Sequence, residues 1–291
     1  MIADQRSRLP WWHRRVVCVT DDEAWASHAG ETIRELGGWL EIIAWSRAAS
    51  LQGPVGALVV DVDVTKAGVE TALVVWAAAA RQPTTLLLVP PARGAARIDH
   101  ALDCLRYGNV FEYASTEGLE TDLNGHLPPI LSRGGWIVPW FAAVLGWSAE
   151  PFLVHVLSLP VLDERRPKNV EEWRRAVRNL SHAEFVDVCR EHGAPNPKEL
   201  HDRLRFAEVT VWAAQRRFPP TRDELARHLH YSSGWYTMQR ARQLAGLTYE
   251  DLVERPVVDV VAVLTRPLLR VGGMPPGRFG EGGSAWSARS S

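Results

Sequence analysis

The chain has 291 residues, of which 46% are hydrophobic and 23% charged, and its formal net charge is −1. This length is sufficient for two domains, each with its own hydrophobic core. The near-zero charge argues against a protein that binds nucleic acid through bulk positive charge alone. Three scattered cysteines, Cys18, Cys104 and Cys189, indicate reduced thiols in a cytoplasmic protein rather than a disulfide framework.

Neither a membrane segment nor an enzyme motif is evident. Residues 1–14, which we treat as an N-terminal arm, contain no apolar run typical of a signal peptide. The longest apolar run, Trp136–Trp147, is shorter than the about 20 residues that a membrane span requires. The motifs H-E-x-x-H, G-x-S-x-G and C-x-x-C do not occur. We therefore expect no membrane partner, no catalytic residues and no enzyme activity.

Short apolar runs alternate with amphipathic segments between residues 15 and 125. The runs lie at 16–19, 40–45, 57–60, 85–89 and 110–113. This alternation predicts a parallel five-stranded sheet with helices on both faces. Functional groups gather at the carboxyl ends of the strands in such sheets. Asp21 and Asp22 follow the first run and Asp61 follows the third, so their carboxylates could together hold a divalent cation.

The motifs VVCVTDDE and ALVVD resemble the first and third strands of the receiver domain of two-component response regulators. The resemblance implies a flavodoxin-like fold, magnesium at Asp21, Asp22 and Asp61, and phosphorylation of Asp61 by a sensor kinase. Val89-Pro90-Pro91 replaces the hydroxyl residue that this family uses for switching, and the lysine expected after the fifth strand is also missing. We therefore expect a degenerate receiver that serves dimerisation or partner binding. A phosphorylated receiver and ordinary solvated acidic turns are the alternatives.

Residues 126–167 are rich in Trp and Pro and indicate a linker. Within this linker, Trp136–Trp147 and Phe152–Leu159 are strongly apolar. They form either a helix packed on the preceding sheet or a self-association surface. A dimer made in this way would suit a protein that binds paired DNA half-sites.

The segment Thr221–Leu252 has the pattern of a helix, a tight turn and a second helix. Leu225, Ala226 and Leu229 form an apolar stripe at helical spacing, and Ser233 is a suitable N-cap after the turn. Gly246 ends the second helix. The side of this second helix opposite its apolar residues carries Gln and Arg side chains. Such side chains can read DNA, since Gln can bond adenine and Arg can bond guanine or phosphate. The expected DNA contacts are Ser233, Trp235, Tyr236, Gln239, Arg240, Arg242 and Gln243. A solvated face on an ordinary helical hairpin is the alternative.

LARHLHYSSGWYTMQRARQLAGLTYEDLV resembles the second helix-turn-helix of AraC-type transcription regulators. The matching residues are Ala226, Tyr231, Ser232, Tyr236, Gly246 and Thr248. The sequence departs from the family where His230 replaces the turn glycine and Tyr249 a proline. The resemblance implies a first unit upstream, and residues 188–200 align with 225–237 without a gap. In that unit Lys198, Asp202 and Arg205 would point outward. Lys198, His201 and Arg205 would contact DNA, although one long helix from about Pro197 to Arg217 leaves no spacer.

The expected fold class is thus a receiver-like (flavodoxin-like) α/β domain with a parallel five-stranded sheet, followed by an all-α helix-turn-helix domain. The domains would span residues 15–125 and 168–255, with a C-terminal extension at 256–291 that is disordered from about residue 271. We expect a dimeric, sequence-specific transcription regulator that binds double-stranded DNA and needs no cofactor besides magnesium in an active receiver. The alternative is an interaction protein whose helix-turn-helix packs against a protein partner.

Overall fold

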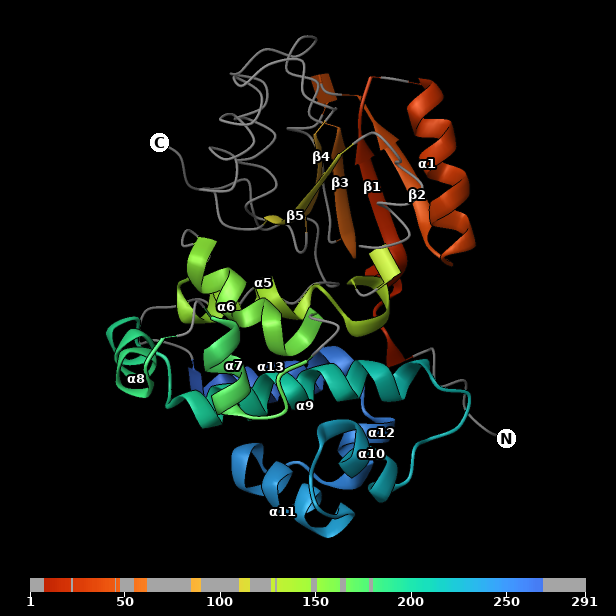
Figure 1. The fold of residues 1–291 in the computed structure, drawn as a ribbon. Coiled ribbons are helices and arrows are strands. Elements are labelled where there is room, and N and C mark those ends of the chain that lie inside the picture. Colours follow the sequence, from red (N-terminus) through yellow and green to blue (C-terminus); the bar gives the residue numbers. More distant parts are fainter. Residues whose placement is uncertain are drawn as a thin grey trace, which may run out of the picture.

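A computed structural model shows a parallel sheet above a larger helical body (Figure 1). The structure describes residues 8–21, 23–44, 46–47, 55–61, 85–89, 110–115, 127–128, 130–147, 151–162, 166–177 and 180–268. The C-terminal segment from residue 271, for which we predicted disorder, lies outside these ranges. None of the described helices combines the length and the apolar character that crossing a membrane requires.

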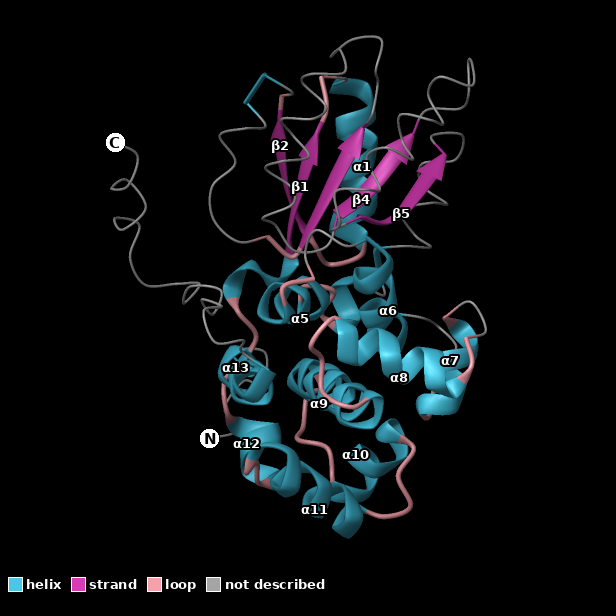
Figure 2. Cartoon of the chain, turned by 90° about the vertical axis from the view of Figure 1, so that its left-hand side faces the viewer, coloured by secondary structure: helices cyan, strands magenta, loops and turns pink. Residues whose placement is uncertain are grey.

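The strands are β1 (Arg15–Val19), β2 (Trp39–Ile43), β3 (Ala57–Asp61), β4 (Thr85–Val89) and β5 (Val110–Ser115). They pair in parallel in the order β2-β1-β3-β4-β5, which leaves β2 and β5 at the two edges (Figure 2). The helix α1 (Glu23–Glu35) joins β1 to β2 and buries Ala29 and Ile33 against Val16 and Cys18 of β1. Every residue of β1 is buried, as its unbroken apolar run predicts for a central parallel strand.

The receiver-like fold class that we predicted is wrong as a description of this chain. A receiver-like sheet alternates with helices that cover both of its faces. Among the described residues α1 is the one helix between strands, and the buried strand side chains lie in β1 and β3, whereas β2 is exposed or half-buried throughout. Helices account for most of the described chain, and those after residue 127 form the larger body. Hydrophobic periodicity indicated strand segments but could not show how the remaining apolar segments pack.

The helices that follow the sheet are α5 (Ile137–Leu145), α6 (Pro151–Leu162), α7 (Val170–Ala176), α8 (His182–Glu191), α9 (Pro197–Gln215), α10 (Arg222–Leu229), α11 (Gly234–Ala245), α12 (Tyr249–Glu254) and α13 (Val257–Thr265). Their buried residues form one continuous core. The Trp-rich segment expected to act as a linker supplies α5 and α6 to this core, packed on each other and on α9. Its apolar side chains are therefore buried against helices.

Helix α9 lies at the centre of the helical body and contacts helices on all sides (Figure 1). The Asn196 side chain accepts a hydrogen bond from the backbone N–H of Glu199, and Pro197 occupies the first turn, so the start of α9 follows ordinary capping rules. Every residue from Leu200 to Val211 is buried, including four charged ones. The charged side chains of a helix that is buried on all sides must find their ion-pair and hydrogen-bond partners within the protein.

A short N-terminal segment, η2 (Trp11–Arg14), ties the sheet to the helical body. The indole N–H of Trp136 donates to Nδ1 of buried His13 over 3.1 Å. The guanidinium of Arg8 donates to the carbonyl of Leu252 at 2.7 Å. A side chain at Gly56, just before β3, would collide with the His13 carbonyl, because a Cβ there would lie only 2.0 Å from that oxygen. The N-terminal segment thus contacts the helical body, at Trp136 and Leu252, and the sheet, at Gly56.

Burial of His13 predicts a loss of stability at mildly acidic pH. Desolvation, followed by the charge of Arg14, lowers the pKa of His13 from 6.5 to about 4. The unfolded chain takes up a proton below pH 6.5 that the folded chain refuses until about pH 4. The stabilisation is therefore complete above pH 6.5 and is lost as the pH falls, by roughly 3 kcal/mol over the whole window. Urea unfolding between pH 7.5 and pH 4 measures this loss of stability.

The matched variants are His13→Asn and His182→Asn. An asparagine Oδ1 can replace Nδ1 of His13 as the acceptor for Trp136 but does not titrate, so the free energy of unfolding of His13→Asn should depend less on pH than that of the wild type. His182 is exposed at the start of α8, and its replacement should leave the pH dependence unchanged. Equal pH dependence in His13→Asn and the wild type would contradict the assignment.

Candidate nucleic-acid interface

The first helix of the interface, α10, is fixed at both ends. Thr221 and Glu224 form a capping box: the Thr221 hydroxyl accepts from the Glu224 N–H, and the Glu224 carboxylate accepts from the Thr221 N–H at 2.7 Å. At the other end His230 adopts the left-handed conformation, with φ 55°. Leu225 and Leu229 are buried, as the apolar stripe predicted. Thus His230 performs the backbone role for which a glycine is usual.

The second helix, α11, begins directly against the first. The Ser233 side chain accepts a hydrogen bond from the N–H of Tyr236, as expected for the N-cap. The N–H of Gly234 donates to Asp223 Oδ1 at 3.1 Å. A Cβ at Gly234 would lie 2.7 Å from the Arg222 Cβ, so only glycine allows this close approach of the two helices. Gly246 then ends α11 with φ 68°.

The two sides of α11 differ sharply in exposure. Thr237, Ala241 and Leu244 are buried against the other helices. The opposite side exposes Trp235, Tyr236, Gln239, Arg242 and Gln243, together with Ser233 at the cap. No acidic residue occurs in α11. The exposed side therefore combines amide, guanidinium and aromatic groups without a negative charge.

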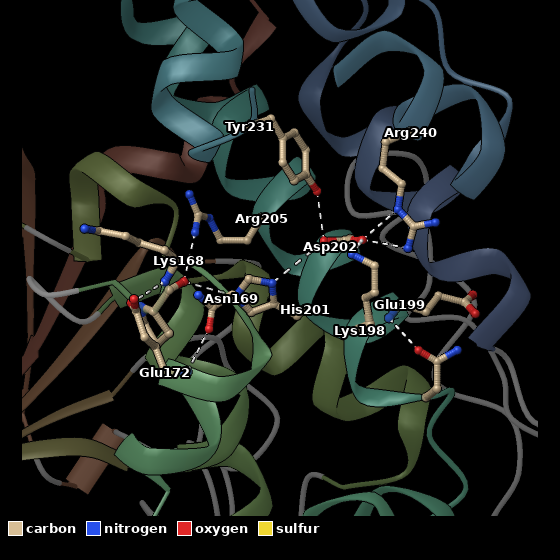
Figure 3. A network of polar contacts seen from close by, with 12 residues as sticks. Lys168, Asn169, Glu172, Lys198, Glu199, His201, Asp202, Arg205, Tyr231 and Arg240 are labelled. Carbon is tan, nitrogen blue, oxygen red and sulfur yellow. Dashed lines mark hydrogen bonds and ion pairs between the residues drawn. The ribbon is translucent and has the colours of Figure 1, made fainter. Parts of the chain in front are cut away.

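Arg240 takes a different place from its predicted neighbours. Its guanidinium binds the carboxylate of Asp202 on α9, with Nε 2.7 Å and Nη2 2.6 Å from Oδ2 (Figure 3). Asp202 is buried, and it also accepts a hydrogen bond from the Tyr231 hydroxyl at 2.8 Å. Tyr231 lies in the turn and Arg240 in α11. One carboxylate therefore positions both the turn and the second helix on α9.

Two of the three residues expected to contact DNA from the upstream unit are buried. Lys198 is exposed, at the start of α9. His201 and Arg205 are buried within the helical body, as is Asp202, which we had also placed outward. The prediction of an outward face was wrong because it assumed that α9 is covered on one side only. His201 and Arg205 therefore cannot reach a DNA groove in this structure.

The buried Arg205 guanidinium serves the backbone instead. Its two Nη atoms donate to the carbonyls of Pro167, at 3.0 Å, and His228, at 2.8 Å. Its Nε has no hydrogen-bond partner among the residues that the structure describes. Burial lowers the pKa of Arg205, and the charge of Glu208 opposes this effect. Arg205 thus joins the segment before α7 to the end of α10.

A second buried carboxylate, that of Glu208, was not singled out by the sequence. It accepts from Arg166 at 2.8 Å and lies 2.8 Å from Nε2 of His228 on α10. The His228 ring stacks on Trp212, with centroids 4.3 Å apart. The sequence did contain an indication of buried carboxylates, because two acids, Asp202 and Glu208, lie among the apolar residues of one helix. Both acids attach α10 and α11 to α9.

The pKa of Asp202 reflects this setting. Burial raises it, but the nearby His201 ring, the hydrogen bonds from Tyr231 and Arg240 and the charge of Arg240 outweigh burial, so the net shift is downward. Among these groups His201 is the most distant, with Nδ1 3.8 Å from Oδ1. Burial and the neighbouring carboxylate raise the pKa of Tyr231. The carboxylate is therefore ionised and the phenol protonated at neutral pH.

The acidic site predicted at the sheet is largely outside the described residues. Asp21 follows β1 and is exposed, whereas Asp22 and the side chain of Asp61, the last residue of β3, are not described. The described residues include no group of three or more His, Cys, Asp or Glu side chains that could hold a metal ion. Magnesium binding and phosphorylation of Asp61 stay predictions.

Comparisons with known proteins do not assign this chain to a family. Neither the family models, nor the curated proteins, nor the solved structures contain a match.

The buried carboxylate of Asp202 predicts a large effect of its removal. Asp202→Ala should lower the free energy of unfolding by about 3–5 kcal/mol, because it leaves Arg240 and Tyr231 without their acceptor. The matched control is Asp187→Ala, which removes an exposed ion pair with Arg190 at 2.6 Å and should cost less than about 1 kcal/mol. Urea unfolding at pH 7 measures both changes. Similar losses in the two variants would contradict the role of Asp202.

Proposed function

We propose that this protein is a sequence-specific DNA-binding transcription regulator, which uses the exposed side of α11 to read the major groove. The observation that supports this proposal most directly is the exposure of Trp235, Gln239 and Arg242 on a helix without acidic residues. A helix of this kind fits the major groove, where Gln contacts adenine edges and Arg contacts guanine edges.

The arrangement of α10 suits the same function. In a helix-turn-helix the first helix lies across the sugar-phosphate backbone while the second enters the groove. Arg222 and Arg227 of α10 are exposed, whereas its acids Asp223 and Glu224 are used for hydrogen bonds to Gly234 and Thr221. The acids of the first turn are thus occupied within the protein, and the arginines are available to phosphates.

The charge of the region favours binding as a dimer. Residues 163–254 contain sixteen Lys and Arg against fifteen Asp and Glu, and of the predicted contacts Arg205 is buried and Arg240 is paired. One copy can therefore neutralise few phosphates, and each phosphate contact contributes a slope of about −0.9 in log K against log salt. Two copies on half-sites one helical turn apart would supply the remaining affinity. We propose that the protein acts in this form in the cytoplasm.

Binding to a protein partner is the second candidate function. The observation in its favour is the burial of His201 and Arg205, which leaves Lys198 as the one exposed residue among the three predicted upstream contacts. A helix-turn-helix with a single exposed side can also pack against a protein. The experiment below separates the two functions.

The test is selection of genomic DNA fragments by the wild type and by Gln239→Ala and Arg242→Ala. The wild type should enrich defined sites, and each substitution should weaken their binding by about 5-fold to 150-fold, since one good base contact contributes about 1–3 kcal/mol. The matched control is Arg190→Ala, an exposed arginine on α8 outside the interface, which should bind like the wild type. Binding at two salt concentrations gives the number of phosphates contacted.

No enrichment by the wild type, or enrichment that both substitutions leave unchanged, would contradict DNA reading by α11. Retained folding of the variants is checked by thermal unfolding, because Gln239 and Arg242 are exposed and their truncation should change stability by less than about 0.5 kcal/mol.

A further inference from the structure

Trp235 is the most exposed large hydrophobic residue in the described part of the chain. Its exposed fraction is 72%, compared with 63% for Trp11 and 55% for Phe218. An indole of this size normally contributes to stability by burial, and here most of its surface faces water. The residue lies in the first turn of α11, at the end of the helix that would enter DNA first. Its position points to a binding role.

The backbone beneath Trp235 is held in place. The Thr237 hydroxyl donates to the Ser233 carbonyl at 2.9 Å, and the Ser233 side chain caps the helix. The neighbouring Tyr236 ring packs edge-on against Tyr231, with centroids 5.4 Å apart. The buried side of α11 is occupied by Thr237 and Ala241. Trp235 therefore cannot turn inward, and it stays outward without rearrangement of the helix.

The chemistry around Trp235 indicates what it would contact. Gln239 lies one turn further along the same side, followed by Arg242, and no acidic residue interrupts them. An apolar protein surface would leave these polar groups unpaired on burial. The major groove offers a matching combination, with polar base edges and one apolar group, the 5-methyl of thymine.

We propose that the Trp235 indole contacts the 5-methyl group of a thymine at one end of the sequence read by α11. This inference rests on the proposed function. The helix rises about 1.5 Å per residue, so Gln239 lies about 6 Å and Arg242 about 10 Å further along it. Base pairs are spaced about 3.4 Å apart, so the distance from Trp235 to Arg242 corresponds to about three base-pair steps. Trp235 contributes apolar specificity, and the two polar residues contribute hydrogen-bond specificity.

The experiment replaces each thymine of a selected site by deoxyuridine, one at a time, and measures the Kd. Deoxyuridine lacks the methyl group and keeps every hydrogen-bonding atom. The wild type should lose about threefold to fivefold in affinity at one position per half-site, as expected for one methyl removed from an apolar contact. Trp235→Ala should bind thymine and deoxyuridine equally at that position. Trp235→Phe, which keeps an aromatic ring, should retain part of the preference.

The matched control is Trp11→Ala, which removes an exposed tryptophan far along the chain and should preserve the full thymine preference. Three results would overturn the inference and leave the proposed function in place. They are specific binding that no deoxyuridine substitution weakens, an equal loss of affinity in the wild type and in Trp235→Ala, and specific binding to sites that contain no thymine. If the wild type shows no specific DNA binding at all, the proposed function is refuted, and the inference with it. In that case a protein partner would be the remaining explanation for the exposed indole.

Discussion

The burial of charge on α9 is the constraint on which the helical body depends. Asp202 and Glu208 are both buried, and a buried carboxylate is tolerated only when it is paired and hydrogen-bonded. Each of them binds a residue of the α10–α11 unit, Arg240 and Tyr231 in one case and His228 in the other. These pairs are directional, whereas apolar packing is not. The orientation of α11 therefore follows from the position of two acids.

The local structure of the interface was largely predictable from the sequence. The Ser233 cap, the Gly246 end and the exposed side with Gln239 and Arg242 each follow from local patterns, and the structure contains all of them. Capping and helical periodicity depend on residues within one or two turns. The exposed side of α11 was predictable for the same reason, although its DNA function stays a proposal.

The wider arrangement could not be predicted in this way. Asp202 and Arg205 were placed outward because a polar residue in an amphipathic helix usually faces water, yet α9 is covered on all sides. The receiver-like fold class failed for a related reason. The apolar segment Trp136–Trp147 was expected to pack on the preceding sheet or to form a self-association surface. The three-dimensional contacts show instead that its helix, Ile137–Leu145, belongs to the helical core. Contacts between residues distant in sequence decide which side of a helix is buried, and a local sequence pattern does not contain these contacts.

The continuity of the helical core has a consequence for dissecting the protein. The α10–α11 unit shares buried pairs with α9, while α9 packs against α5, α6 and α13, and Arg8 of the N-terminal segment bonds the carbonyl of Leu252 in α12. A fragment confined to residues 221–246 would expose Leu225, Leu229 and Leu244 and leave Arg240 unpaired. Helix α11 is therefore not a detachable module. Transfer to another scaffold would require most of the helical body to accompany it.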